Sequence, residues 1–424
     1  MPPTSAIPLL NQRPLLSARA ALGDQPAGSH SPVRSLYIHI PFCFHKCHYC
    51  DFYSIVDKQD RQAAFTDRLI RELAAQAPWA AGAPLSTIFV GGGTPSLLRV
   101  ELWSVLLSAL HTHFDMSHMG TQPGEFTVEC NPETVSAELM DTMVAGGVNR
   151  VSVGAQSFEA KHLNTLERWH DPANVIRAVE LARSAGIGRQ NIDLISGVPG
   201  QTIEEWQRDL QHGLSLGTEH MSCYSLTYEP RTEMTARLKR GEFLPVDDDT
   251  DAAMFELTAS TLRENGLEQY EVSNFAKPGA ECRHNMAYWR QEQWLAAGPA
   301  ASAHVAGHRY KNSPRLDDYL SFSDGGFAPI VDHETPDALK ALKEKVMTSL
   351  RIRDGIELAS LMDDGQRIGD HILPILRSVI DKYIACQSLE MQGEYLRPTT
   401  SGLRIADAIA VDFFVALDRA NTGV

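Results

Sequence analysis

The sequence is poor in basic residues, in cysteine and in long apolar runs. Its 38 Lys and Arg residues are outnumbered by 53 Asp and Glu, so the formal net charge is 38 − 53 = −15. Phosphate backbones and anionic lipids recruit Lys and Arg, so this balance argues against broad binding of nucleic acid or of an anionic membrane surface. No apolar run approaches the ~20 residues that a membrane-spanning helix needs. Seven cysteines are too few, and odd in number, for a disulfide framework in a chain of 424 residues.

The composition is otherwise that of a globular protein with two or three domains, or with one barrel-sized domain and an appendage. Residues 1–33 hold six prolines among Ser, Gly and Ala, which predicts a disordered arm. Pro8 and Pro14 interrupt the only candidate for the apolar core of a secretory signal. An organelle transit peptide with Arg13 and Arg19 is the alternative; we expect a cytoplasmic protein.

Short β-rich runs alternate with helix-length segments between residues 34 and 250. Strands separated by helices form βαβ units around a parallel sheet. Six units are too few for a closed eightfold barrel, so we predict an α/β fold with a partial (β/α)6 TIM-like barrel. The site of such a fold lies at the carboxyl ends of the strands. The predicted strands are Leu36–Ile40, Ser86–Val90, Glu125–Glu129, Arg150–Gly154, Asn191–Ile195 and Met221–Leu226.

The pattern changes after the acidic run Asp247–Asp251, which we interpret as the solvated start of a helix. Residues 251–335 carry a helix, a Gly/Ala-rich stretch and many aromatics, and are expected to extend the barrel. Residues 336–424 read as three helices, a short hairpin and a last helix, the order of a small winged-helix-like module. Residues 340–424 hold 11 Lys and Arg against 12 Asp and Glu, a net charge of −1 that does not suit DNA. The module is therefore expected to serve packing or interaction.

Three of the seven cysteines, Cys43, Cys47 and Cys50, stand on one loop directly after the first predicted strand. Their C-x3-C-x2-C spacing lets three thiolates converge on one inorganic centre. Iron–sulfur cubes usually take four cysteines, so three would leave one iron open, as catalytic zinc sites leave one position open. The alternative is a structural zinc site of Cys3His type, with the imidazole supplied by His39, His45 or His48.

Polar residues and glycines follow the next strands. A Gly-rich turn, Val90–Pro95, follows the second strand, where glycine lets backbone groups approach a ligand. Further along the chain, Glu129, Gln156, Arg168 and Asp193 lie in or shortly after successive strands. Together these residues could surround one small polar ligand.

The cysteine loop, with an aromatic residue before its last cysteine, resembles that of the radical S-adenosylmethionine (SAM) superfamily. The resemblance implies that the three cysteines hold a [4Fe–4S] cluster and that SAM chelates the fourth iron. It also implies that an electron from the cluster can cleave SAM to a 5′-deoxyadenosyl radical. The Gly-rich turn matches the superfamily's GGxP element. By position, the implied SAM contacts are Tyr37, Tyr49, Gly92, Gly93, Thr94, Glu129, Gln156, Arg168 and Asp193.

The segments YIHIPFC, GGGTPS, GVNRVSVGAQSF, NIDLISGVPGQT and YEVSNFAKPG resemble one branch, the oxygen-independent coproporphyrinogen III oxidases and their HemW-type heme chaperone paralogues. The oxidases carry a fourth cysteine that their activity needs; this chain has Phe52 there. The segment Arg283–Trp289 matches the H-N-x-x-Y-W motif of the chaperones, and the resemblance implies heme ligation by His284.

The nearby side chains His304, His308 and Cys282 remain alternative heme ligands. The branch predicts heme transfer to acceptor hemoproteins, with oxidative decarboxylation of coproporphyrinogen III as the alternative function. The sequence leaves open whether a chaperone of this kind is also an enzyme. It also leaves open whether the protein forms a dimer and whether it contacts a membrane through an acceptor. The acidic charge argues against a third class, the tRNA-modifying radical enzymes.

Overall fold

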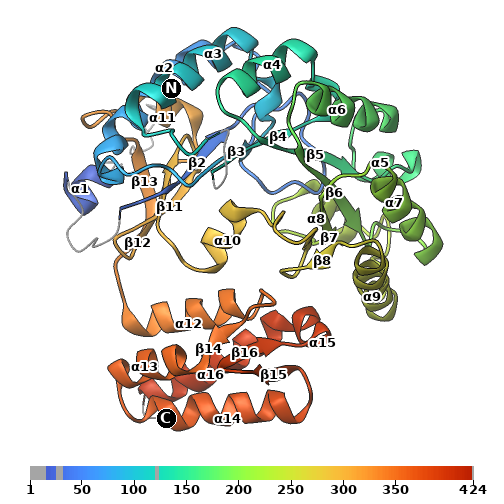
Figure 1. Ribbon diagram of the computed structural model, residues 1–424, viewed down its shortest axis with the longest axis vertical. Coiled ribbons are helices and arrows are strands. Elements are labelled where there is room, and N and C mark those ends of the chain that lie inside the picture. The colour runs from blue at the N-terminus through green and yellow to red at the C-terminus, as the bar shows by residue number, and fades with distance from the viewer. Residues whose placement is uncertain (1–15, 25–31, 120–123, 423–424) are drawn as a thin grey trace, which may run out of the picture.

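One large twisted sheet organises the part of the chain that the computed structural model describes, residues 16–24, 32–119 and 124–422 (Figure 1). Its centre is six neighbouring parallel strands in chain order, and the helices that follow them cover the outer face. All six predicted strands are present, and the partial (β/α)6 barrel is confirmed. The strands are β2 (Ser35–Ile40), β3 (Thr87–Gly92), β4 (Glu125–Cys130), β5 (Arg150–Gln156), β6 (Arg189–Ser196) and β7 (His220–Ser225). The outer helices are α2 (Gln62–Gln76), α3 (Val100–His113), α4 (Ala137–Ala145), α6 (Pro172–Ser184), α7 (Ile203–Ser215) and α9 (Asp248–Glu264).

Strand β5 illustrates how the sequence separates the two faces of the barrel. Side chains alternate along a strand; Val151 and Val153 are buried in the main hydrophobic core. Ser152, Gly154 and Gln156 line the lumen instead. Burying an aliphatic side chain in this way stabilises the fold by about 1.5–3 kcal/mol. The lumen is therefore polar while the layer between sheet and helices is apolar.

Residues 251–335, expected to extend the barrel, add strands to both of its edges; the individual strands were not predicted. On one edge β9 (Asn274–Ala276) pairs antiparallel with β7, and β8 (Glu268–Gln269) pairs with β9. On the other, β10 (Trp294–Ala297) pairs parallel with β2, followed by three antiparallel neighbours. These strands are two to six residues long, too short for a clear two-residue alternation. The outer neighbours are β11 (Ser302–Val305), β12 (His308–Asn312) and β13 (Pro329–Glu334), with α11 (Leu316–Ser321) between the last two.

Helix α10 (Arg283–Trp289) connects the two edges and crosses beneath the amino ends of the parallel strands. Two of its backbone amides, those of Arg283 and His284, donate hydrogen bonds to Glu125, the first residue of β4. The helix thereby forms the floor of the barrel, at the end opposite the cysteine loop.

The arm expected to be disordered over residues 1–33 differs from that expectation at residues 16–24. There β1 (Leu16–Ser17) pairs with β13, and α1 (Ala18–Leu22) follows. The Ser17 hydroxyl caps α1 by accepting from the amide of Ala20, and Ala18 is buried in the main core. Residues 1–15 and 25–31 of the arm lie outside the described residues. Residues 32–33 are described and lead into β2.

The C-terminal module has its own apolar core and lies below the barrel in Figure 1. Its order of three helices, a hairpin and further helices agrees with the winged-helix-like order expected. A backbone ladder joins the two parts: Val272 donates to the carbonyl of Arg351, and Arg353 donates to that of Tyr270. The module comprises α12 (Ala338–Ser349), β14 (Ile356–Glu357), α13 (Leu358–Ile368), α14 (Ile372–Ala385), β15 (Leu389–Gln392), β16 (Tyr395–Pro398), α15 (Thr400–Arg404) and α16 (Ala406–Thr422).

Two further expectations are met. The acidic run begins a helix, because the Asp247 carboxylate caps α9 by accepting from the amide of Thr250. Among the described residues, no helix is both long and apolar enough to cross a membrane.

Candidate functional site

The cysteine loop lies at the carboxyl end of β2, held by backbone hydrogen bonds on both sides. Cys43 donates to the carbonyl of Ile55, and the amide of Thr94 donates to that of Phe42. Further on, the amide of His48 donates to the carbonyl of Leu166. Two short helices, α5 (Ala160–Thr165) and α8 (Glu233–Lys239), contact the loop through these bonds. Leu166 directly follows α5, and the amide of Met234 in α8 donates to the carbonyl of His48.

All three loop cysteines are free and line the same cavity. Burial raises the pKa of the Cys43 thiol and raises that of Cys50 to about 11. The thiols of Cys43 and Cys50 are therefore protonated at neutral pH until a metal displaces the proton. Two side chains stabilise negative charge there, since Thr94 Oγ1 lies 3.6 Å from Cys43 Sγ and Arg168 Nη1 lies 3.9 Å from Cys47 Sγ.

The zinc alternative finds little support in the histidines. His39 is bonded through both ring nitrogens, to the Tyr37 hydroxyl at 3.0 Å and to the Tyr53 carbonyl at 2.8 Å. His48 contacts Arg237, and His45 stacks on Trp169 with ring centroids 3.8 Å apart. Within the described ranges, no three His, Cys, Asp or Glu side chains are gathered closely enough to hold a single metal ion. A Cys3His site would need the loop to rearrange.

The Gly-rich turn after β3 packs directly against this loop. Gly92 has a φ of +111°, and a Cβ there would lie 2.5 Å from the His39 ring. A Cβ on Gly93 would lie 2.7 Å from the carbonyl oxygen of Phe42. Gly92 is thus required by the close approach of His39 in β2, and Gly93 by that of the start of the cysteine loop, besides leaving backbone groups open to a ligand.

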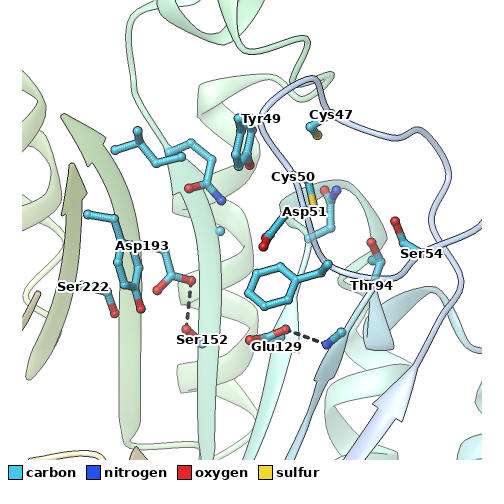
Figure 2. A pocket seen from close by; sticks show the side chains of 18 of the residues that line it. Cys47, Tyr49, Cys50, Asp51, Ser54, Thr94, Glu129, Ser152, Asp193 and Ser222 are labelled. Atoms are coloured by element: carbon cyan, nitrogen blue, oxygen red, sulfur yellow. Dashed lines mark hydrogen bonds between the residues drawn. The ribbon is translucent and has the colours of Figure 1, made fainter. Parts of the chain in front are cut away.

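Glu129 and Asp193 face the lumen between the cysteine loop and the floor (Figure 2). The Glu129 carboxylate accepts from the amide of Gly92 at 3.2 Å. Asp193 accepts from the Ser152 hydroxyl at 2.9 Å and from the Asn191 amide at 2.7 Å. Burial and the neighbouring Asp193 carboxyl raise the pKa of Glu129 to about 8, and burial raises that of Asp193. Both carboxyls would be stabilised in their ionised form by a cationic ligand.

Gln156 and Arg168 complete the wall beside the loop. Gln156 has a φ of +64° at an irregularity in the pairing of β5 with β6, and such a backbone conformation in a non-glycine residue clusters at functional sites. Arg168 donates to the carbonyl of Gly154 at 3.0 Å, so its guanidinium is fixed between β5 and Cys47.

Every residue that the sequence assigned to the cluster or to SAM lines one cavity of about 510 Å³. Its shape and polarity could hold a cluster at the loop and a small polar cation against the two carboxyls. Phe52, which stands where the oxidases have their fourth cysteine, also lines it and is 63% exposed. The assigned residues are Tyr37, Cys43, Cys47, Tyr49, Cys50, Gly92, Gly93, Thr94, Glu129, Gln156, Arg168 and Asp193.

His284 lies in the barrel floor, away from this cavity, and is 0% exposed. Its Nδ1 is 2.8 Å from the Thr87 hydroxyl and its Nε2 is 2.8 Å from the Tyr288 hydroxyl, while its ring stacks on Phe89. Burial lowers the pKa of His284 to about 4, so the imidazole is neutral. In this conformation neither nitrogen is open to heme iron, and ligation by His284 stays a prediction.

The alternative heme ligands differ in accessibility. Cys282 is fully buried, with its Sγ 3.4 Å from Glu125 Oε1. His304 uses Nδ1 to bond the Glu292 carbonyl and lines a groove of about 360 Å³ beside α12. His308 Nδ1 lies 3.1 Å from Nε2 of His333.

Arg150 and Asn285 are among the lumen residues that sequence reasoning missed. Arg150 begins β5, and the polar alternation Arg150, Ser152, Gly154, Gln156 would have placed it on the inner face. Asn285 follows His284 in the floor helix, and no local pattern could show that this helix closes the barrel.

Comparisons with known proteins agree with this geometry. Residues 37–212 match the model of the radical SAM superfamily, and residues 337–405 match that of the HemN C-terminal domain. In fold, the chain is similar to coproporphyrinogen III oxidase (HemN) from Escherichia coli, a radical SAM enzyme, with a TM-score of 0.78 at 22% identity. That likeness covers 94% of this chain and 93% of the oxidase.

Curated relatives are more similar in sequence. The chain is 34% identical to the heme chaperone HemW of Mycobacterium tuberculosis over 398 residues, 93% of this chain and 96% of that protein. It is 33% identical to the heme chaperone HemW of Bacillus subtilis, over 82% of this chain and 92% of the relative. It is 39% identical to the heme chaperone HemW of Escherichia coli, over 65% of this chain and 71% of the relative. The chain belongs to the HemW heme chaperone family within the radical SAM superfamily.

Proposed function

We propose that this protein is a heme chaperone that holds a [4Fe–4S] cluster and SAM in the lumen cavity, binds heme and delivers it to acceptor hemoproteins. The observation that carries the proposal is the convergence of the twelve assigned residues on one cavity, in a chain of the HemW family. Phe52 in place of the fourth cysteine disfavours the alternative, decarboxylation of coproporphyrinogen III.

The residues present suit these groups. Cys43, Cys47 and Cys50 would ligate three irons of a cube, and the cluster would supply electrons and an open iron. Glu129 and Asp193 would hold the cationic groups of SAM, and Glu129 would release its proton as it ionises. The cysteine loop, held by backbone hydrogen bonds, and the Gly-rich turn would fix the distance between the cluster and SAM.

The cluster assignment is tested by replacing the three loop cysteines with serine. The triple variant should lose stoichiometric iron, sulfide and the broad absorbance near 400 nm that a cluster gives. Cys386→Ser, at the exposed cysteine of the C-terminal module, is the matched control and should keep all three. Full iron and sulfide in the triple variant would refute the assignment.

The heme assignment can be tested through the hydrogen bond between His284 and Tyr288. If His284 binds the iron, the Tyr288 hydroxyl must leave Nε2, so Tyr288→Phe should bind heme at least as tightly as the parent protein. His284→Ala should then lose the Soret band of bound heme, and His308→Ala should keep it. Unchanged heme binding in His284→Ala would exclude this ligand and leave His304 as the next to replace.

A further inference from the structure

A second part of the lumen lies below the residues assigned to SAM, and its most prominent group is the side chain of Arg150. Arg150 stands four residues before Gly154 on β5, about 13 Å along the strand. It lines the cavity yet is only 2% exposed. This guanidinium is therefore buried from bulk solvent while it borders an internal space.

The Arg150 guanidinium is poorly satisfied by the described residues. Its one hydrogen bond joins Nη1 to the Thr127 hydroxyl at 3.5 Å, and Nε has no partner. Guanidinium groups carry five N–H donors and remain charged in proteins. A buried guanidinium with unused donors is costly, so these donors mark a position for a hydrogen-bond acceptor.

The neighbouring carboxyls of Glu125 and Asp193 place negative charge near Arg150 but accept no hydrogen bond from it, because other groups occupy their oxygens. Glu125 accepts from Arg189 Nη1 at 2.9 Å and from the amides of Arg283 and His284. Asp193 accepts from Ser152 and Asn191, as described above. Among the described residues, Arg150 forms no ion pair. Arg189 also pairs with Glu219 at 3.0 Å, so the arginines at the foot of the barrel do not lack negative charge. What Arg150 lacks is hydrogen-bond acceptors for its N–H donors.

A second unpartnered atom borders the same space. Asn274 is 4% exposed and lines the cavity, and its Oδ1 has no hydrogen-bond partner. Its amide nitrogen donates to Glu271, which fixes the orientation of the amide. The lumen therefore offers unused donors on Arg150 and an unused acceptor on Asn274, with Asn285 in the floor.

We propose that the lower lumen binds a small hydroxyl-bearing carboxylate, with the carboxylate on Arg150 and the hydroxyl donating to Asn274. Planar carboxylates match the guanidinium with two parallel hydrogen bonds. The same chemistry could come from a free hydroxy acid or, for the carboxylate alone, from a propionate arm of a tetrapyrrole. The site does not depend on the proposed heme function, because a free acid would fill it in either case.

The test measures the thermal unfolding of the purified full chain with sodium glycolate, sodium acetate, methyl glycolate and sodium chloride at matched ionic strength. Glycolate should raise the midpoint most and acetate less, while methyl glycolate and chloride should leave it unchanged. Arg150→Lys and Arg150→Met should weaken glycolate binding by about ten- to a hundredfold. Arg309→Met, which removes a guanidinium bonded to Glu344 outside the lumen, should bind glycolate as the parent does.

The parent protein decides the outcome even if the Arg150 variants fail to fold. Equal effects of glycolate and chloride on the parent would overturn the proposal and show that water alone satisfies Arg150. Competition then identifies the source of the carboxylate. Displacement of glycolate by hemin, but not by hemin dimethyl ester, would assign the site to a propionate arm, and no displacement by either would assign it to a free acid.

Discussion

Glu129 contributes to the pH dependence of the stability of the SAM-free protein, and Glu129→Gln should remove that contribution. The pKa of Glu129 is about 8 in the folded protein, against an ordinary 4.5. Between these values the unfolded chain has released the proton that the folded chain keeps, so stability falls as pH rises. At 1.36 kcal/mol per pKa unit, the full difference corresponds to about 5 kcal/mol. Because Glu129 faces a cavity that admits water, we expect about half, roughly 2–3 kcal/mol.

The assay is urea unfolding of parent and variant at pH 5 and pH 8.5 without SAM. The two proteins should differ by less than about 1 kcal/mol at pH 5, which lies only half a unit above the ordinary pKa of 4.5, so that little of the difference has developed there. At pH 8.5 Glu129→Gln should be the more stable by the amount above. Glu138→Gln, at an exposed position in the first turn of α4, should behave as the parent. An equal loss of stability between the two pH values in parent and Glu129→Gln would refute the reasoning.

Three further predictions concern SAM, the contact between barrel and module, and the covering helices. SAM affinity measured by equilibrium dialysis should rise from pH 6 to pH 8.5, because the cation favours ionised Glu129; a flat profile would contradict this. Burial raises the pKa of Glu271, which pairs with Ile352 of the module, to about 7. The free energy of unfolding of Glu271→Gln should therefore exceed that of the parent by roughly 2–3 kcal/mol at pH 8 and by little at pH 5, as measured by urea unfolding at both pH values. Thr202→Ala removes the capping box of α7 and should cost about 1 kcal/mol in thermal unfolding; no loss would show that the cap is redundant.

Local patterns in the sequence were sufficient for the barrel and for the upper half of the lumen. Each parallel strand is a short apolar run before a helix, and the polar residues at its carboxyl end project into one space because parallel strands end at the same edge. The cysteine spacing and the Gly-rich turn belong to the same edge. For this reason Cys43, Glu129 and Asp193, distant in sequence, could be placed together without a structure.

The floor of the barrel could not be predicted in this way. Helix α10 is seven residues long, and its position follows from strands added at both edges of the sheet, which depends on pairing between distant segments. The motif around His284 therefore indicated a heme ligand, whereas both imidazole nitrogens of His284 are hydrogen-bonded, to the hydroxyls of Thr87 and Tyr288. Burial of this kind is set by tertiary packing and leaves no local signal.

The most direct test of the proposed function is an anaerobic experiment on the reconstituted protein with cluster and SAM. One portion is loaded with heme and mixed with an apo-hemoprotein, and another is given coproporphyrinogen III and a reductant. We predict stoichiometric heme binding, transfer of that heme to the acceptor, and no change in the coproporphyrinogen. Formation of protoporphyrinogen with consumption of SAM, and no transfer of heme, would contradict the proposal and identify a decarboxylating enzyme instead.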